Sequence, residues 1–169
     1  MASTKRKFAG HLGEAAHKAL ASCRTYAPAH VLLNPLTRPL AAQIAHSDWR
    51  ATHKQINFPY TLEDAVIGGE NCVRYRTSRT DPANPVILYL HAGAFVCGSP
   101  RINATGVLPA CELSGCEAIG VDYALAPNAT YPTQLDQIER VYRALLDQGR
   151  SSSRILLMGD SAGGTLALA

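Results

Sequence analysis

The pattern of apolar and polar positions along the chain predicts strands that alternate with helices. Residues 86–90 form a continuous apolar run, too short for a helix and typical of a strand that is buried on both faces of a sheet. Residues 118–123 and 155–158 form two further runs of this kind. Strands in this arrangement, with helical segments between them, predict an α/β fold with a mostly parallel sheet and flanking helices.

Helical periodicity is clearest between the second and third of these strands, over residues 133–148. The predicted buried stripe consists of Leu135, Ile138, Val141 and Leu145. We expect Thr133 to cap this helix, with Asp136 at the capping-box position, and Gly149 to end it. Residues 101–116 predict another helix between the first and second strands. Its inward residues would be Val107, Leu108 and Cys111.

Before the first strand the pattern predicts two helices and then a hairpin. Helical spacing of apolar residues covers positions 8–23, and a second, weaker helical pattern covers residues 40–51 after Pro39. Residues 62–67 and 72–77 are short runs that favour strands. Gly68 and Gly69 join these two runs, which is a hairpin signal.

The composition is that of a folded globular protein. Apolar residues make up 47% of the 169 residues, which excludes intrinsic disorder because such a chain buries enough surface to offset its ordering entropy. No apolar run reaches the roughly 18 residues of a membrane helix, so we expect no membrane span. The formal charge is +3, and the only dense basic cluster is Lys5, Arg6 and Lys7. We therefore expect no binding of nucleic acid.

The cysteines and the N-terminus bear on the compartment. None of the five cysteines has the spacing of a zinc site or of a redox pair, so we expect no metal and interpret them as thiols in a reducing compartment. The basic N-terminus lacks the apolar region of a secretory signal, which makes the cytoplasm the expected localisation. Residues 1–30 are also similar to a mitochondrial transit peptide, and this alternative stays open.

A serine in a glycine-rich turn is the first candidate for chemistry. Residues 159–164 (GDSAGG) follow the third predicted strand and precede the start of a predicted helix. A serine at such a turn needs strained backbone angles and small neighbours, which Gly159 and Gly163 supply. We expect Ser161 to be held clear of the sheet and Gly164 to let the helix lie close to the strand. The alternative is an ordinary glycine-rich turn that binds a phosphate or nothing.

The segment after the first strand, residues 91–95 (HAGAF), is the second candidate. Small residues there allow successive N–H groups to point into a cleft, where they could stabilise an oxyanion together with the N–H after a nucleophilic serine. We interpret the His91 side chain as a structural group that ties down this loop. About 70 residues separate it from Ser161, roughly two βα units, which brings both loops to the carboxyl edge of the sheet.

Residues 91–95, 122–127 (DYALAP) and 159–164 together resemble the hormone-sensitive-lipase-type branch of the α/β-hydrolases. That branch is recognised by an HGGG-type loop, a DYxLAP segment and a GDSAGG elbow in this order, and the resemblance runs from about residue 40 to the end. It implies an α/β-hydrolase fold and hydrolysis of carboxylic esters, usually with short to medium acyl chains. It also implies that no metal or organic cofactor is needed.

The resemblance assigns roles to individual residues. Ser161 would be the nucleophile. The oxyanion would be held by the backbone N–H groups of Gly93, Ala94 and Ala162. The site would be supported by His91, Asp122, Gly159 and Gly163. Residues 1–55 would form a helical cap, and residues 56–169 the N-terminal part of a hydrolase domain that acts on small-molecule esters.

Two departures from the family pattern stand out. Ala92 and Ala94 replace glycines, so we expect the oxyanion hole to survive only if the backbone there avoids positive φ. In this fold the acid and the base follow the serine, but no Asp, Glu or His follows Ser161, and all six histidines precede it. We therefore expect a domain that stops after the nucleophile elbow, with residues 155–158 on an open edge and negligible esterase activity alone.

Three hypotheses for function follow. The first is the N-terminal portion of a serine carboxylesterase, which fits every motif. The second is a catalytically inactive α/β-hydrolase-like protein that binds a small hydrophobic ligand or a partner, as the gibberellin receptors, which resemble this family, have lost a working triad. The third is another acyl-transfer chemistry, such as that of an amidase or peptidase. The intact Ser161 favours the first over the second.

Overall fold

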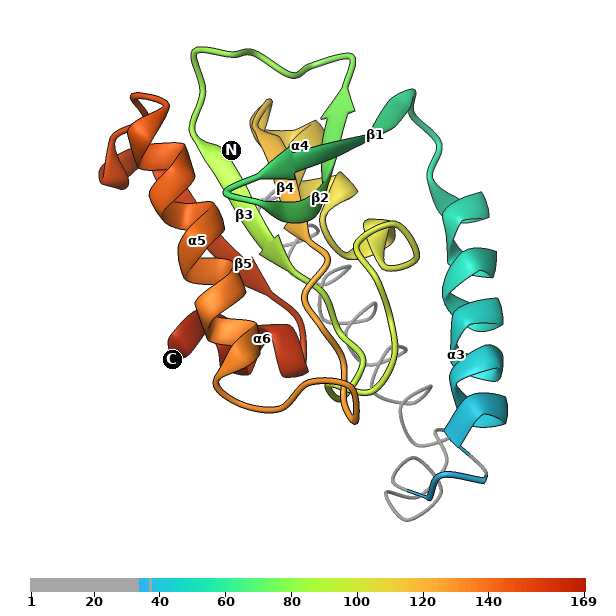
Figure 1. Ribbon diagram of the computed structural model, residues 1–169. Helices are drawn as coiled ribbons and strands as arrows, with labels where there is room; N and C mark the ends of the chain where they lie inside the picture. Colours follow the sequence, from blue (N-terminus) through green and yellow to red (C-terminus); the bar gives the residue numbers. More distant parts are fainter. Residues whose placement is uncertain (1–33, 37) are drawn as a thin grey trace. The chain divides into compact units, whose positions relative to one another are not determined.

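The computed structural model describes residues 34–36 and 38–169 (Figure 1). The chain divides into two units, residues 1–41 and 42–169. In the first, the Asn34 side chain accepts the N–H of Leu36 at 2.9 Å, in a turn that leads into helix α3 (Arg38–Thr52). Helix α3 confirms the helix predicted over residues 40–51, whereas the one predicted over residues 8–23 lies outside the described residues.

A mixed five-stranded sheet forms the centre of the second unit, in the order β1-β2-β4-β3-β5. Its strands are β1 (Tyr60–Ile67), β2 (Glu70–Thr77), β3 (Val86–Leu90), β4 (Glu117–Val121) and β5 (Ile155–Gly159). Strands β4, β3 and β5 run parallel to one another, as predicted. The predicted hairpin β1–β2 is also confirmed, and it adds antiparallel pairings at the β1–β2 and β2–β4 positions.

Several strand boundaries differ from the predictions by one or two residues, because hydrogen bonding, not apolar character, defines them. Strand β4 ends at Val121, so Asp122 and Tyr123 lie beyond it at its carboxyl end. Strand β1 begins at Tyr60, two residues earlier than the apolar run, because it pairs in full with β2 from Tyr60 to Ile67.

Helices cover both faces of the sheet, and β3 contributes to both cores. Leu88 and Leu90 of β3 belong to one core, which they share with residues of α5 (Thr133–Asp147) and α6 (Ala162–Leu168). Ile87 and Tyr89 point to the opposite core, which contains Leu108 and Cys111 of α4 (Leu108–Ser114). This alternation explains why all five residues of β3 are buried, as expected of a central strand.

The helices are confirmed, with corrections at their ends. Helix α4 is shorter than the predicted range 101–116, and the turn η2 (Ala104–Gly106) precedes it.

Thr133 does not cap α5, because it is already the first helical residue and its N–H donates to the Thr130 carbonyl at 3.0 Å. Pro132 takes the capping position, without a side-chain hydrogen bond. Leu135, which the pattern predicts to lie in the buried stripe of this helix, is only partly buried. Two single turns complete the described elements, η1 (His53–Gln55) and η3 (Ser152–Arg154).

Strand β5 lies at the edge of the described sheet. It pairs with β3, and within residues 38–169 no strand pairs with its other side. Leu156 and Leu157 are 46% and 51% exposed, which confirms for the described residues the expectation of an open apolar edge. Among these same residues, no helix combines the length and the apolar content that crossing a bilayer requires.

Candidate active site

The two loops singled out in the sequence meet at the carboxyl edge of the sheet. Strands β3 and β5 are parallel neighbours in which Leu90 pairs with Gly159, so the segments that follow them leave the sheet side by side (Figure 1). The Asp160 N–H donates to the Leu90 carbonyl at 3.2 Å and ties the second loop to the end of the first strand. The predicted juxtaposition is therefore confirmed.

Ser161 occupies a strained turn between β5 and α6. Its φ of 53° and ψ of −115° lie outside the regions that L-residues usually adopt, and the residue is exposed. The turn is closed by the Gly163 N–H, which donates to the Asp160 carbonyl at 2.9 Å, and the Ser161 carbonyl accepts the Thr165 N–H at 3.1 Å as α6 begins. Both the strain and the exposure agree with the sequence prediction.

Glycines make this turn possible, but not all in the predicted way. A Cβ on Gly163 would lie 2.5 Å from the Leu90 carbonyl carbon and 2.8 Å from the His91 oxygen, and one on Gly159 would collide with the Gly163 carbonyl. The prediction for Gly164 is wrong: its Cβ would come no closer than 3.4 Å to the Gly159 oxygen, an ordinary contact. Gly163 therefore allows α6 to approach the neighbouring strand.

The loop after β3, residues 91–98, is folded tightly on itself. The N–H groups of Val96 and Cys97 both donate to the Gly93 carbonyl at 3.0 Å, and the Cys97 thiol donates to the same oxygen at 3.3 Å. Gly93 has a φ of 141°, and a Cβ there would collide with the Cys97 carbonyl. We refer to residues 91–98 as the oxyanion loop, because they include two of the candidate oxyanion donors.

The condition set for the oxyanion hole, a backbone that avoids positive φ at the two alanines, is not met at Ala94, whose φ is 51°. Phe95 also lies in the left-handed region, at 63°. This region costs an L-residue about 1–2 kcal/mol, a modest amount that the surrounding hydrogen bonds can offset. The Phe95 carbonyl, for example, accepts the Ala126 N–H at 2.7 Å. Alanine therefore fits this position despite the positive φ, and its N–H is kept.

The three candidate oxyanion donors share one property. Within the described residues, the N–H groups of Gly93, Ala94 and Ala162 donate to no protein acceptor. Ala162 is the first residue of α6, where a helix leaves its N–H groups without intrahelical partners. Free N–H groups at the end of a parallel sheet are suited to hold a negatively charged oxygen.

His91 is buried and neutral. Its Nδ1–H donates to the Ala92 carbonyl at 2.7 Å, while its Nε2 has no hydrogen-bond partner in the described part of the chain. Burial lowers the pKa of His91 to about 4, with the opposing effect of the Ala92 bond smaller. These contacts support the interpretation of its side chain as structural.

Sequence reasoning missed two residues that hold the oxyanion loop. The Tyr123 hydroxyl donates to the His91 carbonyl at 2.6 Å, and its ring stacks on the imidazole at 4.1 Å between centroids. Tyr123 lies inside the DYALAP motif, so this signal was present in the sequence. His46 of α3, whose Nε2 accepts the Gly98 N–H at 3.0 Å, had no such signal.

Asp122 stays a prediction as a supporting residue. The residue keeps exposed surface although neighbouring atoms partly cover its carboxyl, and its backbone N–H donates to the Asn71 carbonyl at 2.9 Å. Partial burial raises the pKa of its carboxyl, and the nearby charge of Asp64 adds to this shift. No contact between this carboxylate and the two loops is found among the described residues.

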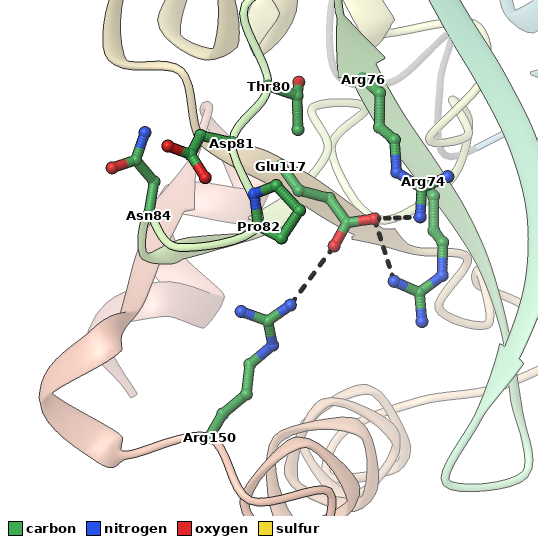
Figure 2. A pocket seen from close by; sticks show the side chains of 8 residues that line it. All are labelled: Arg74, Arg76, Thr80, Asp81, Pro82, Asn84, Glu117 and Arg150. Carbon is green, nitrogen blue, oxygen red and sulfur yellow. Dashed lines mark hydrogen bonds and ion pairs between the residues drawn. The ribbon is translucent and has the colours of Figure 1, made fainter.

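A polar pocket lies at the opposite, amino edge of the sheet (Figure 2). At its centre is Glu117, the first residue of β4, whose carboxylate is approached by Arg76 at 2.8 Å, Arg74 at 3.0 Å and Arg150 at 3.5 Å. The remaining residues that line the pocket are Thr80, Asp81, Pro82 and Asn84. The described residues contain no group of three or more His, Cys, Asp or Glu side chains that could hold a metal ion.

Comparison with known proteins agrees with the candidate chemistry. Residues 87–169 match the family described as alpha/beta hydrolase fold. The chain is 34% identical over 155 residues to "Carboxylesterase/phospholipase LipF" of Mycobacterium tuberculosis, covering 89% of this chain and 41% of LipF. It is 40% identical over 87 residues to "Esterase" of Acinetobacter venetianus, covering 52% of this chain and 29% of that protein.

A solved structure is similar to most of the chain. The crystal structure of an esterase from the bacterial hormone-sensitive lipase family superposes with a TM-score of 0.66 at 29% identity. The match covers 75% of this chain and 43% of the esterase. The chain thus spans less than half of the length of each of these three proteins.

Proposed function

We propose, on the premise that this chain is an α/β-hydrolase of the hormone-sensitive-lipase type matched over the family's N-terminal portion, that it carries the nucleophile of a serine hydrolase acting on carboxylic esters. The proposal is supported by a strained, exposed Ser161 in the segment that follows β5, next to the segment that follows β3, and by the N–H groups of Gly93, Ala94 and Ala162, which donate to no protein acceptor among the described residues. Two of the relatives, an esterase and a carboxylesterase/phospholipase, support the same reaction.

The reaction is the two-step transfer of an acyl group. The Ser161 oxygen attacks the ester carbonyl and passes its proton to a general base, and the oxygen of the tetrahedral intermediate accepts hydrogen bonds from the N–H groups of the oxyanion loop and Ala162. The protonated base then gives its proton to the departing alcohol. Water, activated by the same base, attacks the acyl-serine and releases the carboxylic acid.

The general base is not among the described histidines. His46 accepts the Gly98 N–H, His53 contacts the Ile102 carbonyl at 3.0 Å, and His91 is buried against Ala92. None of the three hydrogen-bonds to Ser161 in the described part of the chain. In this fold the acid and the histidine follow the serine in the chain, and no Asp, Glu or His follows Ser161 in the given sequence. We therefore propose that a part of the protein outside these 169 residues supplies the base and its acidic partner.

Two further proposals concern the setting of the reaction. Residues 1–55 would act as a helical cap over the acyl pocket, and helix α3 lies within that segment. Cys72, Cys97, Cys111 and Cys116 are free and buried. Free thiols are typical of a reducing compartment, and we place the protein in the cytoplasm.

The test compares the protein isolated from its native source with a Ser161→Ala variant expressed in the same host. Hydrolysis of p-nitrophenyl butyrate should fall at least about 10³-fold, since the nucleophile is lost. A Ser47→Ala variant, altered at an exposed helical position, serves as the matched control. Equal turnover by wild type and Ser161→Ala would refute the proposal.

The competing hypothesis is a catalytically inactive protein that binds a hydrophobic ligand or a partner, and the absence of a base among the described residues is what favours it. The intact mass of the native protein separates the two. A mass well above 18.1 kDa, with ester hydrolysis that depends on Ser161, supports the enzyme. A folded native species of 18.1 kDa whose ester turnover equals that of its Ser161→Ala variant supports the binding protein.

A further inference from the structure

His46 connects helix α3 to the oxyanion loop. Its Nε2 lies 3.0 Å from the backbone nitrogen of Gly98, and because an amide N–H can only donate, the imidazole nitrogen is the acceptor. The imidazole is therefore neutral, with its proton on Nδ1. Gly98 is the last residue of the oxyanion loop and is buried, whereas His46 is half-buried on the helix.

The position of Gly98 is transmitted to the candidate oxyanion donors. A Cβ on Gly98 would lie 2.8 Å from Nδ1 of His91, so this residue sits directly against the start of the loop. The two N–H groups that precede it, on Val96 and Cys97, both bond to the Gly93 carbonyl. A shift of Gly98 would therefore move the Gly93–Ala94 peptide, which carries the Gly93 carbonyl and the Ala94 N–H, and with it the adjoining peptide that carries the Gly93 N–H.

Two more contacts hold the end of α3 to the segment that follows the loop. The Thr52 and Thr105 hydroxyls are 3.0 Å apart, and Nε2 of His53 lies 3.0 Å from the Ile102 carbonyl. His46 is thus one of three polar contacts along the same stretch. It is the one that reaches the oxyanion loop itself.

We propose that His46 is a positioning residue for ester hydrolysis: its neutral imidazole accepts the Gly98 N–H and so holds the oxyanion loop in the conformation that presents the Gly93 and Ala94 N–H groups. The proposal rests on the proposed function of this site. His46 acts through the loop and does not touch the reacting atoms.

The contact depends on the protonation state of His46. A protonated imidazole would direct an N–H at the Gly98 N–H, and the bond would be lost. The groups that act electrostatically on this imidazole are Arg50, one turn along α3, and His91 in the oxyanion loop. Burial, followed by the charge of Arg50, lowers the pKa of His46, so the acceptor form is present at neutral pH and is lost on acidification.

The first experiment observes the Gly98 amide directly in protein labelled with ¹⁵N-glycine. In His46→Leu the Gly98 amide proton should move upfield and exchange with solvent at least about tenfold faster. In His46→Gln the side-chain carbonyl replaces Nε2 as acceptor, so the Gly98 amide should stay protected at neutral pH. It should also stay protected on acidification, whereas the wild-type amide should lose its protection. Ser47→Ala is the control. An unchanged Gly98 amide in His46→Leu would overturn the proposal.

A second readout uses the only tryptophan of the sequence, Trp49, whose ring lies 6.1 Å from that of His46. A protonated imidazole quenches a nearby indole. Wild-type fluorescence should fall on acidification with a midpoint below about 6.5, and His46→Gln should remove this step. If His46→Leu fails to fold, the fluorescence titration and the protection of the Gly98 amide in His46→Gln still test the proposal. A His46→Gln variant that shows the same fluorescence step and the same loss of Gly98 protection at low pH as wild type would overturn it.

The kinetic experiment separates this inference from the proposed function. His46→Leu should lower kcat about tenfold with little change in KM, and His46→Gln should restore most of kcat. If Ser161→Ala abolishes turnover but His46→Leu does not lower kcat, only the positioning role fails. If Ser161→Ala retains turnover, both fail as statements about hydrolysis, even where the Gly98 hydrogen bond is found.

Discussion

The two edges of the central sheet use polar groups in opposite ways. At the carboxyl edge, the Gly93, Ala94 and Ala162 N–H groups have no protein acceptor among the described residues, and the backbone at Ser161 is strained. At the amino edge, the Glu117 carboxylate is already held by three guanidinium groups (Figure 2). Unused hydrogen-bonding capacity, not the number of polar groups, distinguishes the candidate active site.

The two edges also differ in what destabilises them: backbone strain at the carboxyl edge and desolvation of charged groups at the amino edge. Positive φ at Ala94 and the unusual turn at Ser161 each cost of order 1–3 kcal/mol, which tertiary packing must offset. Ion pairs such as those of Glu117 cost desolvation but leave no strain in the backbone. We therefore expect the stability of the carboxyl edge to respond most to added side-chain volume and to protonation of the buried His91. We expect the stability of the amino edge to respond most to the loss of the Glu117 carboxylate.

The largest effect is expected from Gly163→Ala, which would overfill the carboxyl edge. The added methyl group would lie 2.5 Å from the Leu90 carbonyl carbon, backbone against backbone, so α6 must move away from β3. We expect the free energy of unfolding to fall by roughly 4 kcal/mol or more in a urea titration. Gly164→Ala is the matched control, with an expected change of at most about 1 kcal/mol. Equal stability of the two variants would contradict the geometry.

The next effect concerns acidification, which charges the carboxyl edge. The folded pKa of His91 is lowered to about 4, so its contribution to stability is fully present above the unfolded pKa of about 6.5 and is lost as the pH falls from 6.5 to 4. The loss should reach about 3 kcal/mol, since His91 is fully buried.

Urea titrations at pH 7, 5 and 4 measure this loss, and His91→Asn provides the control. Asparagine can keep the hydrogen bond to the Ala92 carbonyl but does not titrate, so the variant should lose about 3 kcal/mol less than wild type between pH 7 and pH 4. Parallel pH dependence of the two proteins would show that His91 is not buried in its neutral form.

The smallest effect is expected at the amino edge, from Glu117→Gln. A neutral amide cannot balance the positive charge of the three guanidinium groups. Because the arginine side chains are 25–40% exposed, however, water solvates part of that charge. We expect a loss of about 2 kcal/mol, below that of a fully buried pair. Glu139→Gln, which removes an exposed pair with Arg143, should cost at most about 0.5 kcal/mol. A loss at Glu117 no larger than this control would show that the cluster is merely a surface network.

The strands and most of the candidate site could be predicted from local sequence. The apolar run of β3 and the turn residues Gly68 and Gly69 gave the correct elements, because buried parallel strands and tight turns leave local patterns. The glycine-rich elbow gave the strained Ser161 for the same reason. Local reasoning failed at Thr133 and Gly164, where the hydrogen bonds and the crossing of α6 over β3 decide.

What the sequence by itself determined is the order of elements and the identity of the loops that follow β3 and β5, since both depend on residues adjacent in the chain. Only the tertiary structure decided that Tyr123 and His46 hold the oxyanion loop. Their partners are the His91 carbonyl and the Gly98 N–H, main-chain groups that every residue carries. Distant contacts to such groups depend on where the chain passes in space, and they leave no pattern along the sequence.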